Sequence, residues 1–208
     1  MVGIDVSHHN GEIAWNKVKI DFAIIRTGFG KKSSKQIDRE FERNYMACKK
    51  YHIPCGAYHY SYAKTIEDAE KEADFVLELL KGKKFEFPIY FDMEEKFQVN
   101  LGKTKCTAMF KAFADKLEKA GYWVGIYSFD SFFQTNLEDG IEKRYTAWVA
   151  RVENIKPNSC KPAIWQYSWK GRVEGINGDV DMNKCDIDYP SIIKKAHELS
   201  KNDSKSNK

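Results

Sequence analysis

The sequence predicts an α/β fold in which eight strands close into a barrel. Short apolar runs alternate with segments of helical periodicity, and such repetition is typical of parallel strands joined by crossover helices. Eight of the apolar runs qualify as strands. The 208 residues suit one domain, because α/β barrels span roughly 200–250 residues. We therefore expect a TIM-like barrel, with a flat, doubly wound sheet as the alternative fold.

The strand candidates are short and apolar, and turn-forming or polar residues bound them. In chain order they are Val2–Ser7, Phe22–Thr27, Cys55–Tyr60, Phe87–Glu94, Tyr122–Ser128, Tyr145–Ala150, Ala163–Tyr167 and Asp179–Asn183. Because helical segments separate most of them, we expect the strands to run parallel.

Helical periodicity is clearest between the early strands. Apolar residues recur at steps of three and four within residues 36–51, 65–81 and 104–120, and a last helix fits 189–199. Thr65 with Asp68 resembles a capping box at the start of the second helix. Residues 152–162 and 168–178 read as loops, so we expect about five helices and few or none beside the last strands.

Charge and cysteine content exclude several classes of protein. Lys and Arg number 34 and Asp and Glu 30, which gives a net charge of +4. This mild excess favours an anionic polymer, but no basic stretch alternates with aromatics as in a nucleic-acid-binding surface. The 5 cysteines include no C-x-x-C pair, which argues against a zinc ribbon or a disulfide framework. No apolar run is long enough to span a membrane, and no secretory signal follows Met1.

Two carboxylates stand at the end of the fourth strand candidate. Because strand side chains alternate, Tyr90, Asp92 and Glu94 share one face, which we expect to point into the barrel mouth. The other face is apolar and suits packing on helices: Phe87, Ile89, Phe91 and Met93. Each charge disfavours the other, so one carboxyl of the pair should keep its proton near neutral pH, as a general acid must. A solvated loop after the strand is the structural alternative.

The other strand ends add acidic and aromatic side chains to the same mouth. These are Asp5, Tyr58, Tyr60, Tyr127, Trp148, Gln166, Asp181 and Asn183. Because the active site of a parallel barrel lies where its strands end, we expect these side chains to converge. An acidic groove with aromatic walls suits sugars, whose rings stack on aromatic faces. Turn capping by Asp5 and Asp181, and ordinary barrel packing by the aromatics, are the alternatives.

The histidines have plainer interpretations. We expect His59 to be a buried, hydrogen-bonded residue rather than a metal ligand, and His8 and His9 to be loop residues. Cys55 and His59 share a strand face, as the nucleophile and base of a cysteine peptidase would, but no third partner is evident. A zinc amidase would need a His-rich ligand set such as H-E-x-x-H, which the sequence lacks.

From Gly3 to about His197 the sequence resembles the glycoside hydrolase family 25 muramidases, the N-acetylmuramidase lysozymes of phage, bacteria and fungi. The resemblance rests on six motifs in the same order: Gly3–Gly11 (GIDVSHHNG), Gly56–Tyr60 (GAYHY), Asp92–Glu94 (DME), Trp148–Ala150 (WVA), Trp165–Ser168 (WQYS) and Gly178–Asn183 (GDVDMN). One position departs from the pattern, since Val152 stands where many members have a tyrosine.

The resemblance implies an eight-stranded barrel that hydrolyses the β-1,4 bond from N-acetylmuramic acid to N-acetylglucosamine in peptidoglycan. Glu94 would be the general acid and Asp92 its partner. Asp5 and Asp181 would tune this pair, and Tyr58 and Tyr127 would position the sugar. Asp92 could be the base of an inverting enzyme, or could orient an acetamido group that itself attacks the anomeric carbon. A wall-binding module without catalysis is the alternative function.

The family also implies the setting in which the protein works. Its partner would be the glycan strand of peptidoglycan, and no cofactor, metal, nucleic acid or membrane insertion is implied. We expect one monomeric catalytic domain over residues 1–199, with residues 200–208 as a polar tail or a linker to a C-terminal cell-wall-binding domain. Without a visible signal peptide, we expect an endolysin released through a holin-type pore, or a trimmed sequence.

Overall fold

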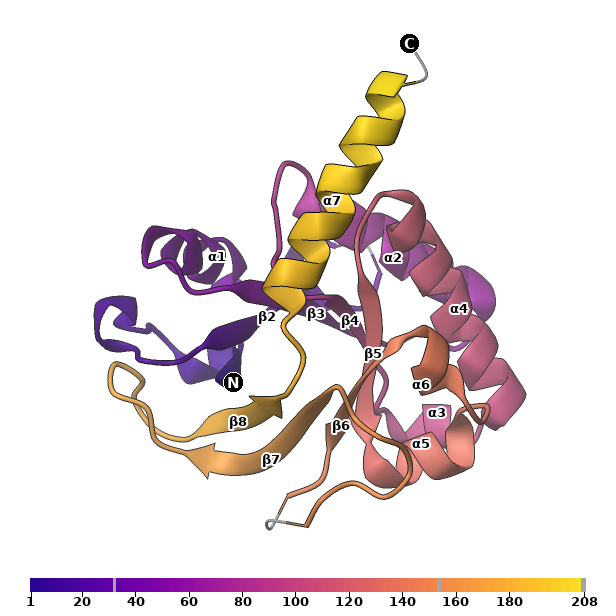
Figure 1. Ribbon diagram of the computed structural model, residues 1–208. Coiled ribbons are helices and arrows are strands. Elements are labelled where there is room, and N and C mark those ends of the chain that lie inside the picture. Colours follow the sequence, from indigo (N-terminus) through magenta and orange to yellow (C-terminus); the bar gives the residue numbers. More distant parts are fainter. Residues whose placement is uncertain (32, 153–154, 207–208) are drawn as a thin grey trace.

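The computed structural model describes residues 1–31, 33–152 and 155–206, and its strands form one closed barrel in chain order (Figure 1). The strands are β1 (Val2–Val6), β2 (Phe22–Phe29), β3 (Cys55–Tyr60), β4 (Ile89–Asp92), β5 (Val124–Phe129), β6 (Thr146–Ala150), β7 (Ile164–Gly171) and β8 (Val180–Cys185). The predicted barrel is confirmed, and the doubly wound sheet is wrong because β1 pairs with β8.

The sequence predicts that all strands run parallel, and this is wrong for one of them. Strands β1 to β7 pair parallel in succession, but β8 is antiparallel to both β7 and β1. The cause is the connection between β7 and β8, which contains no helix. A parallel return needs a crossover of about a dozen residues or more, whereas an antiparallel return needs only a turn.

The described residues form seven α-helices, which cover the barrel unevenly (Figure 1). They are α1 (Phe41–Lys50), α2 (Ile66–Leu80), α3 (Lys96–Val99), α4 (Lys103–Lys119), α5 (Asp130–Asn136), α6 (Ile141–Arg144) and α7 (Tyr189–Ser206). The long helices α2 and α4 lie side by side outside β3 to β5. The described residues between β6 and β8 form no helix, as predicted. The helices outnumber the predicted five or so because the short helices α3, α5 and α6 were not predicted.

Two helix boundaries differ from the prediction. The helix expected from residue 36 begins at Phe41, because Ser34–Gln36 form a 3-10 turn and Ile37 pairs with Gly28 of β2 as a bridge. The last helix, expected to end at residue 199, continues to Ser206. The start of α2 is as predicted, since the Thr65 hydroxyl accepts the backbone N–H of Asp68 at 3.1 Å.

The barrel wall separates two apolar clusters. The outer cluster lies between the wall and the helices and includes Ile89, Phe91 and Met93 of the β4 segment. The inner cluster fills the barrel and includes Phe22, Tyr90 and Trp148. Phe87 was expected on the outer face, but it precedes β4 and stacks on Phe22 inside, with ring centroids 4.6 Å apart.

Most of the cysteines are buried. Cys48, Cys55, Cys106 and Cys185 are buried free thiols, and Cys160 is half-buried. Within the described ranges, no helix is both long and apolar enough to cross a membrane.

Candidate active site

A cavity of about 370 Å³ opens at the end of the barrel where the parallel strands finish. Nine of the residues singled out from the sequence line it: Asp5, Tyr58, Tyr60, Asp92, Glu94, Tyr127, Trp148, Gln166 and Asp181. Asn183, the tenth, hydrogen-bonds Asp5 from the neighbouring strand. The barrel thus brings together the side chains that the sequence separates by up to 178 positions.

The paired carboxyls of β4 differ in environment. Asp92 is 2% exposed, and its Oδ1 has no hydrogen-bond partner. Burial, the neighbouring Glu94 and then Asp5 raise the pKa of Asp92 well above its usual range. Glu94 is half-buried, and burial, followed by the charges of Asp5 and Glu95, raises its pKa to about 7. A carboxyl that titrates near neutrality can hold a proton and deliver it, as general acid catalysis requires.

Asp5 is the centre of a polar network beneath this pair. Its Oδ2 accepts Nε2 of Gln166 at 2.9 Å and Nδ2 of Asn183 at 2.7 Å. The Gln166 Oε1 in turn accepts the hydroxyl of Tyr127 at 2.8 Å, and Asn183 Oδ1 accepts Nε1 of Trp148 at 2.7 Å. Asp5 is therefore a partner of side chains across the barrel and not a turn cap. Burial raises its pKa to about 6, although both amide hydrogen bonds lower it.

Asp181 completes the acidic floor from β8. Burial, then the charges of Asp5 and Glu94, raises its pKa to about 8. Four carboxyls with raised pKa values therefore surround one small cavity. Because like charges in such a space disfavour one another, not all of them can be ionised at neutral pH.

Aromatic rings form the walls. The Trp148 ring is buried and packs against Tyr58, Tyr90 and Tyr127, with centroids 5.8, 5.2 and 4.3 Å away. Barrel packing therefore accounts for Trp148. Tyr60 is more open and its hydroxyl donates to Glu95 at 2.9 Å.

Trp169 stands at the rim, where sequence reasoning did not place a residue. It is 50% exposed, and its Nε1 donates to Gln166 Oε1 at 2.9 Å. The strand β7 runs past the predicted end at Tyr167 to Gly171 and so carries this ring to the mouth.

Several other lining residues were missed from the sequence. They are Val6, Ser7, His9, Asn10, Arg26 and Asp179. His8 and His9 do not lie in an open loop but in a 3-10 turn, His8–Asn10, which Ser7 caps. Arg26 could have been found, because a lone charge in the apolar run Phe22–Phe29 falls on the same face as Phe22 and Ile24.

The other candidate groups are buried away from the cavity. His59 is 0% exposed, and its ring nitrogens contact Thr27 Oγ1 at 2.9 Å and Gly30 O at 2.7 Å. Burial lowers its pKa to about 4, so the prediction of a buried, hydrogen-bonded histidine is confirmed. Cys55 lies in the outer cluster, and the His59 contacts leave neither ring nitrogen for it. Among the described residues no group of three His, Cys, Asp or Glu is arranged to hold a metal.

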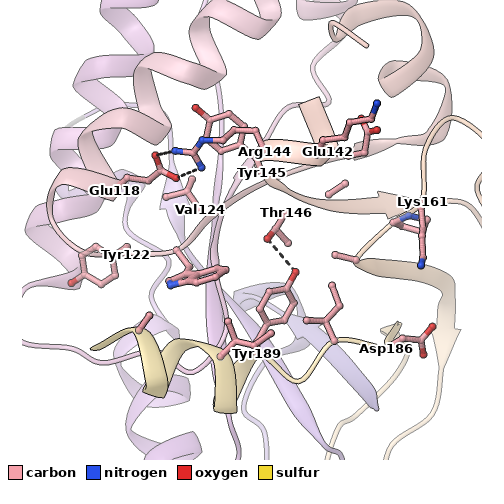
Figure 2. Close-up of a pocket in the computed structure, with 18 of the residues that line it drawn as sticks. Glu118, Tyr122, Val124, Glu142, Arg144, Tyr145, Thr146, Lys161, Asp186 and Tyr189 are labelled. Atoms are coloured by element: carbon pink, nitrogen blue, oxygen red, sulfur yellow. Dashed lines mark hydrogen bonds and ion pairs between the residues drawn. The ribbon is translucent and has the colours of Figure 1, made fainter. Parts of the chain in front are cut away.

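A larger cavity of about 990 Å³ lies at the opposite end of the barrel, beside the start of α7 (Figure 2). Glu118 there is paired with Arg144 through two contacts of 2.9 and 2.6 Å. Figure 2 also shows Tyr189 donating to Thr146. The carboxyls among its described lining residues, Glu118, Glu142 and Asp186, are all at least partly exposed, so none is enclosed as Asp92 is, and size does not make it the candidate active site.

Comparison with known proteins points to one family. The profile described as "Glycosyl hydrolases family 25" matches residues 4–176. The Escherichia coli K12 protein YegX is 31% identical over 195 residues, which cover 87% of this chain and 68% of YegX.

Solved structures agree with the profile. The modular autolysin LytC from Streptococcus pneumoniae superposes with a TM-score of 0.76 at 31% identity, over 88% of this chain and 46% of LytC. A bacterial lysozyme from Streptomyces coelicolor superposes with a TM-score of 0.78 at 26% identity, over 93% of this chain and 95% of that one. The chain therefore spans less than half of the modular autolysin and nearly the whole of the smaller lysozyme.

Proposed function

The chain belongs to glycosyl hydrolase family 25, and we propose that its acidic cavity hydrolyses the β-1,4 bond between N-acetylmuramic acid and N-acetylglucosamine, with Glu94 as general acid. The chain is a glycoside hydrolase that acts on peptidoglycan, like the lysozymes that it resembles. The observation that supports the assignment to Glu94 is its pKa of about 7 beside an open cavity. A protonated carboxyl there can protonate the glycosidic oxygen of the leaving sugar.

Asp92 is assigned a different role because its surroundings differ. With 2% exposure it has little access to the bulk water that an inverting base would activate. Its Oδ1 has no partner in the free protein, and a buried carboxylate oxygen is costly to leave unpaired. An acetamido N–H of the bound sugar can supply that partner. We therefore assign Asp92 the task of orienting the acetamido group, whose carbonyl oxygen attacks the anomeric carbon.

This route proceeds in two steps. The acetamido oxygen forms a bond to the anomeric carbon while Glu94 gives its proton to the departing glycosidic oxygen, which leaves a cyclic oxazolinium on the muramic acid. Glu94, now ionised, takes a proton from a water molecule that attacks the same carbon and reopens the ring. Both displacements invert the carbon, so the product keeps the β configuration.

The remaining residues support these two. The Asp5 network holds Tyr127 and Gln166 at the cavity wall. Tyr58 and Tyr60 also line the cavity, from β3, and offer aromatic faces on which a sugar ring can stack. Action as a monomer stays a prediction. Release through a holin-type pore and attachment of a cell-wall-binding domain stay predictions.

The test is a digestion. The purified protein is incubated with Gram-positive peptidoglycan, the products are reduced with borohydride, and the reduced sugar is identified by mass spectrometry. Reduced muramic acid is expected, and reduced glucosamine would mean that the other glycosidic bond is cleaved. Wall binding without new reducing ends would overturn the catalytic assignment. The anomer released first, read by proton NMR, should be β; an α product would overturn the role given to Asp92.

A further inference from the structure

Strand β7 is irregular next to the cavity. Gln166 pairs with Asn183 of β8. Two positions later along β7, Ser168 pairs with Met182, which is only one position along β8. β7 therefore contains one extra residue here, a β-bulge, and a bulge redirects the side chains that follow it. In a regular strand Trp169 would lie on the face opposite to Gln166, whereas the bulge lets it turn to the same side.

Trp169 lies beside the acidic floor of the cavity. Its indole Nε1 donates to Gln166 Oε1 at 2.9 Å, and Gln166 lines the cavity. Across the ribbon that β7 forms with β8, the segment 168–171 lies opposite the stretch of β8 that contains Asp181. Asp181 also lines the cavity. The indole therefore stands at the rim, between the cavity and solvent.

The indole is held in one orientation although half of it is exposed. Trp169 is 50% exposed, whereas its partner Gln166 is 1% exposed. The Gln166 Oε1 also accepts the hydroxyl of Tyr127 at 2.8 Å, and its Nε2 donates to Asp5 at 2.9 Å. Because Oε1 accepts two donors and Nε2 has an acceptor, the amide cannot turn without losing hydrogen bonds. A lone exposed aromatic needs no explanation, but one anchored at its polar edge to a buried network presents its faces in a fixed direction.

The ligand that suits this ring is the part of the substrate that lies outside the cavity. A cavity of about 370 Å³ encloses only a short part of a polymer, so a bound glycan strand must cross the rim. The faces of a pyranose ring carry C–H groups and stack on aromatic rings, while its hydroxyls reach water or neighbouring carboxylates. An indole fixed at the rim is placed to make this contact.

We propose that Trp169 is a sugar-binding platform, which stacks on a ring of the glycan strand next to the two rings joined by the cleaved bond. This inference rests on the proposed function and deepens it. The enzyme then holds at least three consecutive sugars, so its affinity depends on a contact outside the acidic cavity. Trp169 is a specificity-determining residue and takes no part in the bond-breaking step.

The first test measures binding without turnover. The ligand is a soluble glycan oligomer, the hexasaccharide of alternating N-acetylglucosamine and N-acetylmuramic acid, titrated calorimetrically into the Glu94→Gln protein. Adding Trp169→Ala should raise Kd by about five- to tenfold, the effect of losing one aromatic contact. Adding Trp169→Phe keeps an aromatic face and loses the N–H, so Kd should stay within about threefold. The matched control is Trp123→Ala, since this ring is 38% exposed and lines the cavity at the opposite end; Kd should not change.

The second test uses the fluorescence of the tryptophans. Stacking removes water from the indole of Trp169, so the oligomer should shift the emission of the Glu94→Gln protein to shorter wavelength. Adding Trp169→Phe should abolish this shift while binding persists. In the active enzyme, Trp169→Ala should raise KM by about five- to tenfold and change kcat by less than about threefold, because Gln166 keeps its bonds to Tyr127 and Asp5.

Two results would overturn the inference. An unchanged Kd in Trp169→Ala would mean that no sugar rests on the ring, and a Kd in Trp169→Phe as high as in Trp169→Ala would mean that the indole acts only through Gln166. Should Trp169→Ala not fold, as judged by circular dichroism, the fluorescence shift and its loss in Trp169→Phe decide. A wild-type protein that does not cleave the oligomer would instead reject the proposed function, so the two failures are distinguishable.

Discussion

At the scale of single residues, the cavity gives two carboxyls on one strand different degrees of burial and different hydrogen-bond partners. Asp92 and Glu94 stand on the same face of the β4 segment, two positions apart. One is enclosed and has an unpartnered oxygen, whereas the other is half-buried and open to the cavity. Their differences in solvation, rather than in residue type, assign them separate tasks.

Glu94→Gln should remove the general acid and leave the shape of the cavity intact. We expect kcat to fall by about 10²–10⁴-fold, the usual contribution of a positioned acid, while wall binding is retained. Initial rates on peptidoglycan, with co-sedimentation of protein and walls, measure the two separately. Full activity in this variant would reject the role given to Glu94.

Asp92→Asn keeps the size of the side chain but loses the anion that orients the acetamido group. We expect kcat to fall at least about tenfold, because the attacking oxygen is no longer aligned and the oxazolinium is no longer stabilised. Rates on the soluble glycan oligomer, with circular dichroism as a check on folding, test this. A smaller loss would mean that Asp92 is not obligatory.

The pH dependence follows from the pKa of Glu94, which is raised to about 7. A general acid works only while protonated, so kcat/KM should decline as pH rises through about 7, approaching tenfold per unit above it. A kcat/KM profile between pH 5 and 9 measures this, and activity that stayed constant to pH 9 would contradict it.

At the scale of elements, α2 anchors the loop that follows β3 through one buried carboxyl. Glu72 is 1% exposed; its Oε1 accepts the N–H of Tyr62 at 2.9 Å, and its Oε2 has no partner. Burial raises its pKa from 4.5 to about 7. The folded protein therefore binds a proton that the unfolded chain has released, so this group costs stability as pH rises from about 4.5 to 7, and the cost remains above that range.

Glu72→Gln should remove this pH dependence, because the amide keeps the acceptor for Tyr62 and cannot ionise. We expect a Tm equal to that of the wild type near pH 5 and several degrees higher above pH 7, since a carboxyl so shifted is worth roughly 3 kcal/mol. The matched control is Glu70→Gln on the exposed face of the same helix. Equal Tm changes in both variants at every pH would contradict the argument.

The elements also show how far sequence reasoning reaches. All eight strands and the two longest early helices follow from local apolar periodicity, which packing then reinforces. The direction of β8 and the inward turn of Phe87 do not, because they depend on a short connection and on the barrel interior. Asp92 and Glu94 could be predicted as a pair because side chains alternate between the two faces of a strand. Arg26 was visible as a lone charge in an apolar run and was overlooked, whereas its partners Asp38 and His8 are known only once the chain is folded.

At the scale of the whole molecule, α7 closes the barrel end opposite the active site and its later turns project beyond the barrel (Figure 1). Tyr189 at its start is 2% exposed, its ring lies 5.5 Å from that of Phe87, and its hydroxyl donates to Thr146 at 3.1 Å. The start of the helix therefore covers the inner apolar cluster at the end of the barrel opposite the carboxyls.

Tyr189→Ala should open a void at that end of the barrel. We expect a loss of about 3–5 kcal/mol in the free energy of unfolding, as for large buried aromatics. Activity at 25 °C should change less than twofold, because the cavity at the other end is untouched. Chemical denaturation and rates on the soluble glycan measure both quantities. Ile192→Ala, at 40% exposure on the same helix, is the control and should be close to neutral. Equal losses from the two substitutions would contradict the closure argument.

The strand that closes the barrel also sets the time at which the enzyme becomes active. Asp5 stands on the first strand, and its two amide partners lie 161 and 178 positions later in the chain. Contacts so distant in sequence form late, after the intervening strands are in place. A ribosome-bound fragment that ends before β8 lacks both Asn183 and Asp181, so its acidic floor is incomplete. We therefore expect an incomplete chain to be inactive on peptidoglycan, and activity to begin only when synthesis has passed the last strand.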